Sequence, residues 1–218
     1  MTLRALIEVW PLEAGIYIHE LPGVYASGPT TDAALEVLPD VVERHLAWLA
    51  SHGFDIGDAP VEIAIAEEMP AVEGRYGPLF DADREPLTTD AGEQALQIAG
   101  LARRDLVDLY RAVSDVRRSW RPEGGWSIAD HLVHVAEMER FYLGSLPWCV
   151  DSRLPDDPVR ALQASALLAE SALREAPEAS RSAVFTHAGE RWTVAKVARR
   201  MAAHLREHLP WVQELARH

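Results

Sequence analysis

The chain has 218 residues, of which 48% are hydrophobic, so it can bury a core and general disorder is excluded. Its formal net charge of −13 disfavours nucleic acid as a partner, because the phosphate backbone is also negative. The sequence has no apolar run of about 18 residues, so we expect no transmembrane helix and no membrane partner. The N-terminus lacks a signal-peptide pattern, and the single cysteine, Cys149, cannot form an internal disulfide. We therefore expect a cytoplasmic protein.

The negative charge is concentrated in one part of the chain. Residues 1–90 contain 17 acidic and 4 basic side chains, whereas residues 91–218 contain 17 of each. Such an asymmetry predicts two modules, of which the acidic one could meet a basic protein partner. We divide the chain into a first module over 1–70, a linker over 71–90 and a second module over 91–218. A fragment of about residues 88–218 should then fold and keep any metal by itself.

The first module is predicted to have the order β-β-β-α-β. Alternating apolar residues and turn residues indicate strands, and helical spacing of leucines indicates one helix, capped by Thr30 or Thr31. Pro39 lies inside that helix and should kink or split it. The expected strands cover 3–10, 16–20, 24–27 and 61–66, and the expected helix covers 33–49.

Residues 21–49, LPGVYASGPTTDAALEVLPDVVERHLAWL, resemble the HicB-like fold of antitoxin domains. The shared features are the LPG turn, a glycine before a threonine-rich helix start, and an Ala-Leu pair that begins the helix. The resemblance covers about residues 1–70. HicB proteins bind a toxin and often carry a DNA-binding tail, whereas this sequence shows no basic tail or helix-turn-helix. A generic α/β sandwich that serves packing or dimerisation is the alternative.

The second module is predicted to be an all-α four-helix bundle, which makes the whole chain an α+β protein. Four amphipathic stretches follow the linker, and short breaks rich in proline and glycine separate them. Pro210 should interrupt the last helix just after His208. Apolar surface left on the first helix makes a homodimer plausible. The expected helices cover 91–119, 127–146, 158–176 and 193 to near the C-terminus.

Two histidines, His204 and His208, lie on the apolar seam of the last helix. The seam alternates spacings of four and three residues, as in the buried stripe of a bundle helix. A buried imidazole costs free energy unless its nitrogens find partners, and two rings one turn apart can share one partner. A divalent metal ion is the simplest such partner. The seam consists of Val197, Met201, His204, His208, Trp211 and Leu215.

The second helix supplies a further histidine pair, His131 and His134. Four features of the sequence together resemble the DinB/YfiT-like superfamily. They are a Trp-Ser helix start at Trp126, a histidine eight residues later, a Trp-Thr helix start at Trp192 and two histidines four residues apart. The match covers about residues 91–218. Members bind a divalent metal through one histidine of the second helix and two of the last. At the matching positions of this sequence, the family pattern implies that His134, His204 and His208 are the metal ligands.

His131 is the rival ligand on the second helix. Asp130 and Glu137, on either side of His134 in the sequence, could hydrogen-bond a ligand ring or act as a base, with surface solvation as the alternative. No catalytic residue is assigned.

Three neutral imidazoles on facing helices would form an open site with room for water or a small-molecule substrate. Imidazole suits Zn, Ni, Cu or Fe, of which we expect Zn or Ni, and binding should weaken as the pH falls through about 6. The resemblance implies a metal-dependent thiol transferase, isomerase or hydrolase that uses an activated water or thiolate. The alternative is a non-enzymatic regulatory protein, in which the acidic HicB-like domain recognises a protein partner and the metal is structural.

Overall fold

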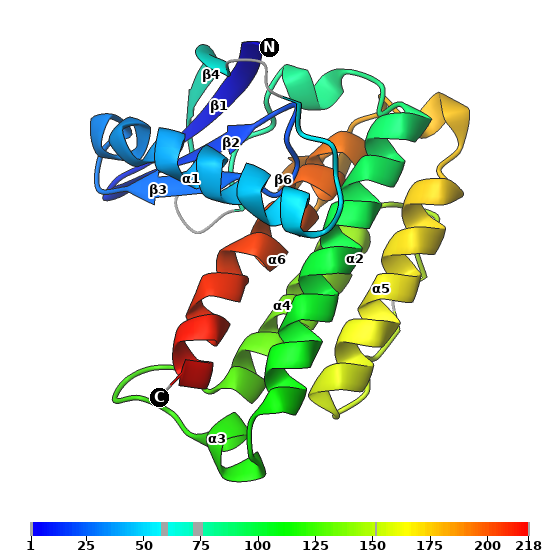
Figure 1. Ribbon diagram of the computed structural model, residues 1–218. Helices are drawn as coiled ribbons and strands as arrows, with labels where there is room; N and C mark the ends of the chain where they lie inside the picture. The colour runs from blue at the N-terminus through cyan, green and yellow to red at the C-terminus, as the bar shows by residue number, and fades with distance from the viewer. Residues whose placement is uncertain (1, 58–60, 72–75, 151, 218) are drawn as a thin grey trace.

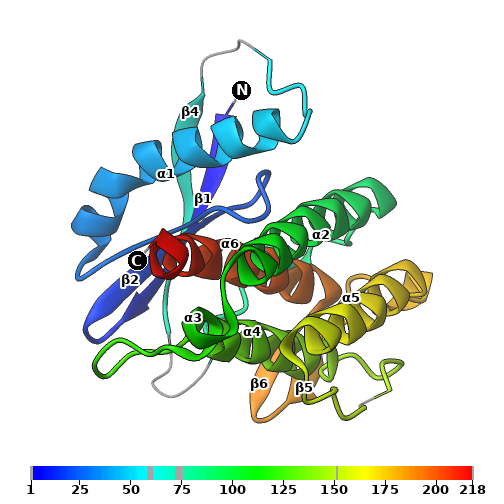
Figure 2. The ribbon, with the colours of Figure 1, turned by 60° about the horizontal axis from the view of Figure 1, so that its bottom comes forward.

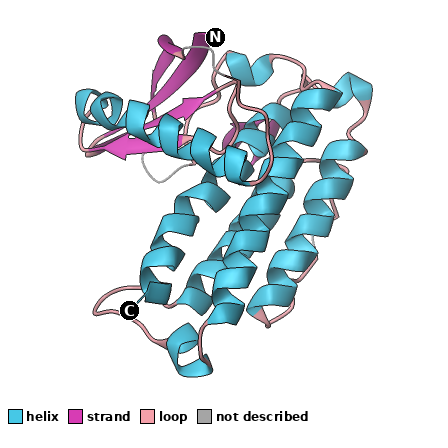
Figure 3. Ribbon diagram, viewed as in Figure 1, coloured by secondary structure: helices cyan, strands magenta, loops and turns pink. Residues whose placement is uncertain are grey.

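The computed structural model describes residues 2–57, 61–71, 76–150 and 152–217. An N-terminal layer of strands and one helix lies against one end of a helical bundle (Figure 1). Helices dominate the rest of the chain (Figure 3), so the expected α+β class is confirmed. The elements are β1 (Thr2–Trp10), β2 (Glu13–Ile18), β3 (Tyr25–Gly28), α1 (Thr31–Ser51), β4 (Glu62–Pro70), α2 (Thr89–Ala112), α3 (Asp115–Ser119), α4 (Ile128–Leu143), α5 (Pro158–Arg174), β5 (Phe185–His187), β6 (Glu190–Trp192) and α6 (Val194–Arg217).

The N-terminal sheet has the strand order β3-β2-β1-β4, so the predicted β-β-β-α-β order is confirmed. β1 pairs antiparallel with β2 and parallel with β4, and β2 pairs antiparallel with β3. The Thr30 side chain accepts a hydrogen bond from the backbone N–H of Ala33 and caps α1. The HicB-like identity of this module stays a prediction.

The two faces of the sheet have different neighbours, because successive side chains of a strand point to opposite faces. Leu3 and Ile7 of β1 are fully buried in a cluster with Leu38 and Val42 of α1. On the other face, the buried Leu6 clusters with the connecting segment and α6, through Phe80, Ala82 and Ala203 among others. The sheet is therefore a middle layer between α1 and the bundle.

The bundle consists of α2, α4, α5 and α6, which confirms the expected number of long helices. α2 contacts α5 and α6, and α4 contacts the same two helices, so the four form a closed ring. Figure 2 shows the bundle obliquely from its lower end, with the sheet beside α6. The core between them is apolar and includes the fully buried Ala99, Leu106, Leu132 and Val197.

Two expectations about the helices are wrong: that 91–119 is one helix and that Pro210 interrupts the last one. For Pro39, a kink or a split was expected, and only the split is contradicted. The stretch 91–119 is two helices, because Val113 is extended and the Ser114 side chain starts α3 by accepting from the Arg117 N–H. Neither Pro39 nor Pro210 splits its helix: α1 and α6 each run through their proline. A proline removes one helical hydrogen bond, and the apolar faces that α1 and α6 bury outweigh this loss.

A short hairpin was not expected from the sequence. β5 and β6 pair antiparallel and lead directly into α6. Ala188 and Gly189 at the turn have positive φ angles of 51° and 77°, the conformation that a tight hairpin requires. The hairpin buries Trp192 completely against the bundle, which fixes where α6 begins.

The segment that precedes α2 is irregular, as expected, but its described part is not a loose tether. Phe80 and Asp83 are buried, and a 3-10 turn covers Ala82–Arg84. The Thr193 hydroxyl donates to the Asp83 carbonyl at 2.6 Å, and the Lys196 ammonium donates to the Gly77 carbonyl at 2.9 Å. The segment thus packs between the sheet and α6. The domain division at residues 70 and 90 stays a prediction.

None of the described helices is long and apolar enough to span a membrane.

Candidate metal centre

A capping box fixes the start of α4 and therefore the position of its histidines. The Ser127 hydroxyl accepts from the Asp130 N–H, and the Asp130 carboxylate accepts from the Ser127 N–H at 2.8 Å. These two reciprocal hydrogen bonds form a capping box. His131 and His134 follow in the first turns of α4, where they face α6.

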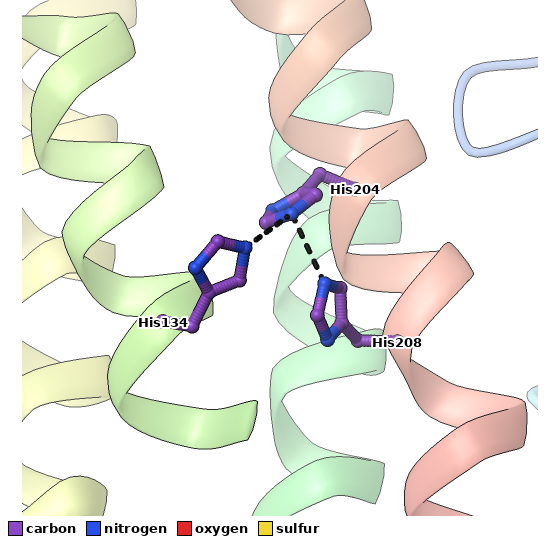
Figure 4. Close-up of side chains that lie close together, drawn as sticks. All are labelled: His134, His204 and His208. Atoms are coloured by element: carbon purple, nitrogen blue, oxygen red, sulfur yellow. Dashed lines mark hydrogen bonds between the residues drawn. The ribbon is translucent and has the colours of Figure 1, made fainter. Parts of the chain in front are cut away.

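Three imidazole rings from two helices converge in the bundle (Figure 4). Nε2 of His134 on α4 lies 3.2 Å from Nε2 of His204 on α6. Nε2 of His208 lies 3.1 Å from the same His204 atom. One ligand atom from each of the three residues lies within 4.8 Å of the other two. The structure therefore brings together the three histidines that the sequence had singled out.

These separations fit a shared metal ion. Two nitrogens bound to one tetrahedral Zn²⁺ at about 2.0–2.1 Å lie roughly 3.3 Å apart. Among the described residues, no fourth histidine, cysteine or carboxylate belongs to the cluster. Three protein donors with a free position are typical of catalytic sites, whereas structural zinc sites are usually closed by four.

His131 is placed beside this cluster and not within it. Its Nδ1 lies 2.8 Å from Nδ1 of His208, while Nε2 of His208 faces His204. A ring that ligates through Nε2 carries its proton on Nδ1, so Nδ1 of His131 would accept that proton's hydrogen bond. His131 would thus orient the His208 ring, and a role of His131 as the rival ligand is not supported by the geometry.

Two indole rings flank the histidines. The Trp126 ring lies 4.5 Å from the His134 ring and 6.2 Å from the His208 ring, measured between centroids. The Trp211 ring lies 4.9 Å from the His208 ring. Both tryptophans are about half-exposed. They cover the histidine rings on the side where the bundle meets solvent and limit how far these rings can turn.

Burial keeps the cluster neutral. Desolvation, helped by neighbouring histidines, lowers the pKa of His208 to about 2. Desolvation, His134 and Arg200 lower the pKa of His204 to about 3. Desolvation also lowers the pKa of His134. Neutral imidazole is the form that binds a metal, so at pH 7 the site needs to lose no proton before binding.

A small polar cavity lies on the other side of His204. It has a volume of about 60 Å³, enough for a few waters, and it is formed where α4 and α6 meet the N-terminal sheet. Arg200 crosses its wall: its Nη1 donates to Glu8 at 3.1 Å, and it also bonds the Tyr17 hydroxyl. The lining residues are Glu8, Tyr17, Tyr25, Tyr142, Arg200, Ala203, His204 and Glu207.

The cavity shifts the pKa of one of its acids, Glu207. Burial raises its pKa to about 7, against the opposing effect of Arg200. A carboxyl that can gain or lose a proton near neutral pH is suited to general acid–base catalysis. The sequence did not single out Glu207 or the sheet residues of the cavity. Only the long-range packing of the sheet on α6 brings them beside His204.

The remaining acidic, histidine and cysteine side chains that could serve a metal site either have other partners or lie outside the cluster. Asp130 is occupied by the capping box and by Arg121, whose Nε lies 2.6 Å from it. Glu137 accepts from Arg140 at 2.8 Å, so neither carboxylate is placed as a base at the cluster. His52 lies beside Asp105, and Cys149 is partly buried and outside the cluster.

Comparison with known protein families matches residues 98–212 to the DinB superfamily. The match contains α4 from its first to its last residue and all three converging histidines. No curated protein and no solved structure matches the chain. DinB domains are generally metal-binding, so a three-histidine cluster is expected in such a domain. The match spans more than half of the 218 residues. The chain belongs to the DinB superfamily.

Proposed function

We propose that this protein is a metal-dependent enzyme of the hydrolase, thiol transferase or isomerase type, with a divalent ion, Zn or Ni, held by His134, His204 and His208. The observation that carries the proposal is the convergence of three neutral imidazoles with no fourth protein donor among the described residues. A divalent ion in such a setting supplies Lewis acidity that favours loss of a proton from a water or a thiol.

Side chains around the three histidines would orient the rings, shield them and transfer protons. His131 holds the His208 ring in one orientation through the 2.8 Å contact between their Nδ1 atoms. Trp126 and Trp211 shield the rings. Glu207, in the cavity beside His204, can take up or release a proton near neutral pH. Tyr142 and Arg200 line the same cavity and offer hydrogen bonds to a polar group that enters it.

Metal content is the first test. Protein purified without a histidine tag, from cells grown with Zn and Ni, should contain about one equivalent of a transition metal. The His204→Gln variant should lose it while far-UV circular dichroism stays unchanged. Less than about a tenth of an equivalent in the unmodified protein would contradict the proposal.

A second measurement distinguishes a metal site with a free coordination position, as in an enzyme, from a closed structural site. Cobalt(II) can replace zinc and reports its coordination through visible absorption. Azide added to the cobalt protein should change this spectrum, because a free coordination position can exchange its ligand. A spectrum that azide does not alter would indicate a closed site and would favour the non-enzymatic alternative.

That alternative rests on the charge distribution. The 17 acidic and 4 basic side chains of residues 1–90 suit recognition of a basic protein, and a HicB-like domain could serve this purpose. In this case the metal would stabilise the bundle and carry out no reaction. Nucleic acid is disfavoured as a partner on the same grounds.

A further inference from the structure

A second cavity, separate from the histidine cluster, lies where the sheet, the connecting segment, α2 and α6 meet. Its volume is about 340 Å³, within the range of small-molecule sites, and junctions between structural layers are where such sites often occur. α2 and α6 run past the sheet at this junction (Figures 1 and 2). None of the three clustered histidines lines it.

Small side chains create the space. Three structural segments contribute alanines where larger residues would close the gap between them. Ile18 at the end of β2 and Leu87 before α2 add larger apolar surface to the walls. The cavity is therefore mainly apolar and can hold a hydrocarbon or aromatic body. The alanines are Ala82, Ala91, Ala95, Ala195 and Ala198.

The polar groups at this cavity carry an excess of negative charge. Arg199 forms a buried bidentate pair with Asp83, with nitrogen–oxygen distances of 2.9 and 2.7 Å, and this pair is neutral as a whole. Arg4 is shared by two carboxylates: its Nε lies 2.6 Å from Glu20 and its Nη1 lies 2.8 Å from Glu85. One guanidinium cannot neutralise both acids.

His19 does not correct this imbalance. Burial and the nearby Arg4 lower the pKa of His19, so the ring is neutral at pH 7 although it lies 3.7 Å from Glu85. The surrounding module adds to the negative potential, because residues 1–90 contain 17 acidic side chains and only 4 basic ones. An anion would be repelled from this cavity and a cation attracted to it.

We propose that this cavity binds a small organic cation, with an ammonium or amidinium head against Glu85, beside the Arg4–Glu20 pair, and an apolar body over the alanines. The apolar walls supply affinity for the body, and the unbalanced carboxylates select the charge of the head. Arg4 keeps the two carboxylates in place for this contact. The site is independent of the metal centre.

Three probes that share one ring test the charge preference. Benzylammonium, benzyl alcohol and benzoate can be titrated into ¹⁵N-labelled full-length protein while amide shifts are followed by NMR. We expect benzylammonium to bind with a dissociation constant of the order of millimolar, benzyl alcohol more weakly and benzoate not detectably. The shifted amides should include those of Ala91, Ala95 and Ala198. Binding of benzoate or benzyl alcohol as tight as that of benzylammonium would overturn the proposal, as would an absence of shifts at these residues.

Two variants with matched controls complete the test. Ala91→Leu fills the cavity from its edge and should weaken benzylammonium binding about tenfold, whereas Ala166→Leu on α5 should not change it. Glu85→Gln should weaken binding about threefold, whereas Glu93→Gln, which removes an exposed acid paired with Arg174, should not. Because Glu85 is exposed, its variant stays informative even if Ala91→Leu fails to fold. Affinity unchanged by Glu85→Gln would contradict the charge argument.

Discussion

At the scale of single residues, the contact between His131 and His208 determines how the cluster can work. A metal-ligating imidazole needs a partner for its second nitrogen, and the partner fixes which nitrogen is protonated. His208 has such a partner in His131, whereas Nδ1 of His204 is buried without one among the described residues. The two clustered histidines of α6 are therefore not equivalent, and the His208 ring is the better oriented of them.

This asymmetry predicts the effect of replacing His131. The His131→Phe variant keeps an aromatic ring against Trp126 and Trp211 but removes the acceptor for the His208 N–H. We expect metal affinity to fall about 10- to 100-fold, as for other outer partners of ligating histidines. Competition with a chromogenic chelator measures this. His187→Phe, in the hairpin, is the control, and equal affinities of the two variants would show that His131 has no orienting role.

The same burial predicts acid sensitivity of the metal-free protein. In the folded state the pKa of His204 is about 3 and that of His208 about 2, whereas an unfolded histidine has a pKa of about 6.5. Between these values the unfolded chain binds more protons, so folding stability falls as the pH falls below about 6.5. Urea midpoints of the metal-free protein should therefore decrease from pH 7 to about pH 4.5.

A variant without the two rings gives the control for this pH effect. His204→Phe/His208→Leu should have a flatter pH profile, because the groups that take up protons on unfolding are absent. An equally steep profile would assign the acid sensitivity to other residues. Because the pKa values of His204 and His208 are low, we expect protons to weaken metal binding only below the pH of about 6 at which exposed imidazoles would become protonated.

At the scale of elements, α6 connects every functional feature of the molecule. It carries His204 and His208, the Arg200 of the small cavity, and the Ala195, Ala198 and Arg199 of the larger one. It also runs without a break through Pro210, which is exposed. The geometry of the histidine cluster thus depends on a helix that contains a destabilising residue two positions after His208.

Replacing that proline should stabilise the protein. Pro210→Ala restores a backbone N–H that can bond the carbonyl four residues earlier, and we expect a gain of about 1 kcal/mol or more. The matched control is Pro158→Ala, because proline suits the first turn of α5 and its loss should bring no gain. Thermal unfolding of both variants measures the difference. A lower melting temperature for Pro210→Ala would mean that the helix depends on the proline geometry.

Local patterns in the sequence predicted most elements and singled out His204 and His208, and the family resemblance added His134. Helical spacing and the Ser127 cap are properties of a few neighbouring residues, and His204 and His208 share a face whatever the rest of the chain does. The break at Val113 comes with the Ser114 cap of α3, which helical spacing does not contain. The continuity at Pro210 depends on packing between helices. The His131–His208 contact and the cavity with Glu8, Tyr17 and Glu207 join residues far apart in sequence, so no local pattern could predict them.

At the scale of the whole molecule, the N-terminal layer and the bundle share buried polar contacts. Asp83 pairs with Arg199, Glu8 pairs with Arg200 at 3.1 Å, and the Gly77 carbonyl accepts from Lys196. Each contact joins a group before residue 88 to a basic side chain of α6. Tyr17 and Tyr25 of the sheet also close the cavity beside His204. The fragment 88–218, expected to fold and keep metal by itself, would lose all of these contacts and should therefore be less stable than the full chain.

The fragment 88–218 tests this directly. Without the sheet, α6 would expose Ala202 and Ala203 and lose the partners of Arg199 and Arg200. We expect the fragment to keep helical circular dichroism but to unfold at a lower urea concentration than the full chain. Its metal affinity should be at least about tenfold weaker, because His204 would lose the wall that excludes water from it. Adding a separately expressed fragment 1–87 should restore part of both properties. If the fragment equals the full chain in urea midpoint and metal affinity, the bundle is autonomous and the sheet contributes only the second cavity.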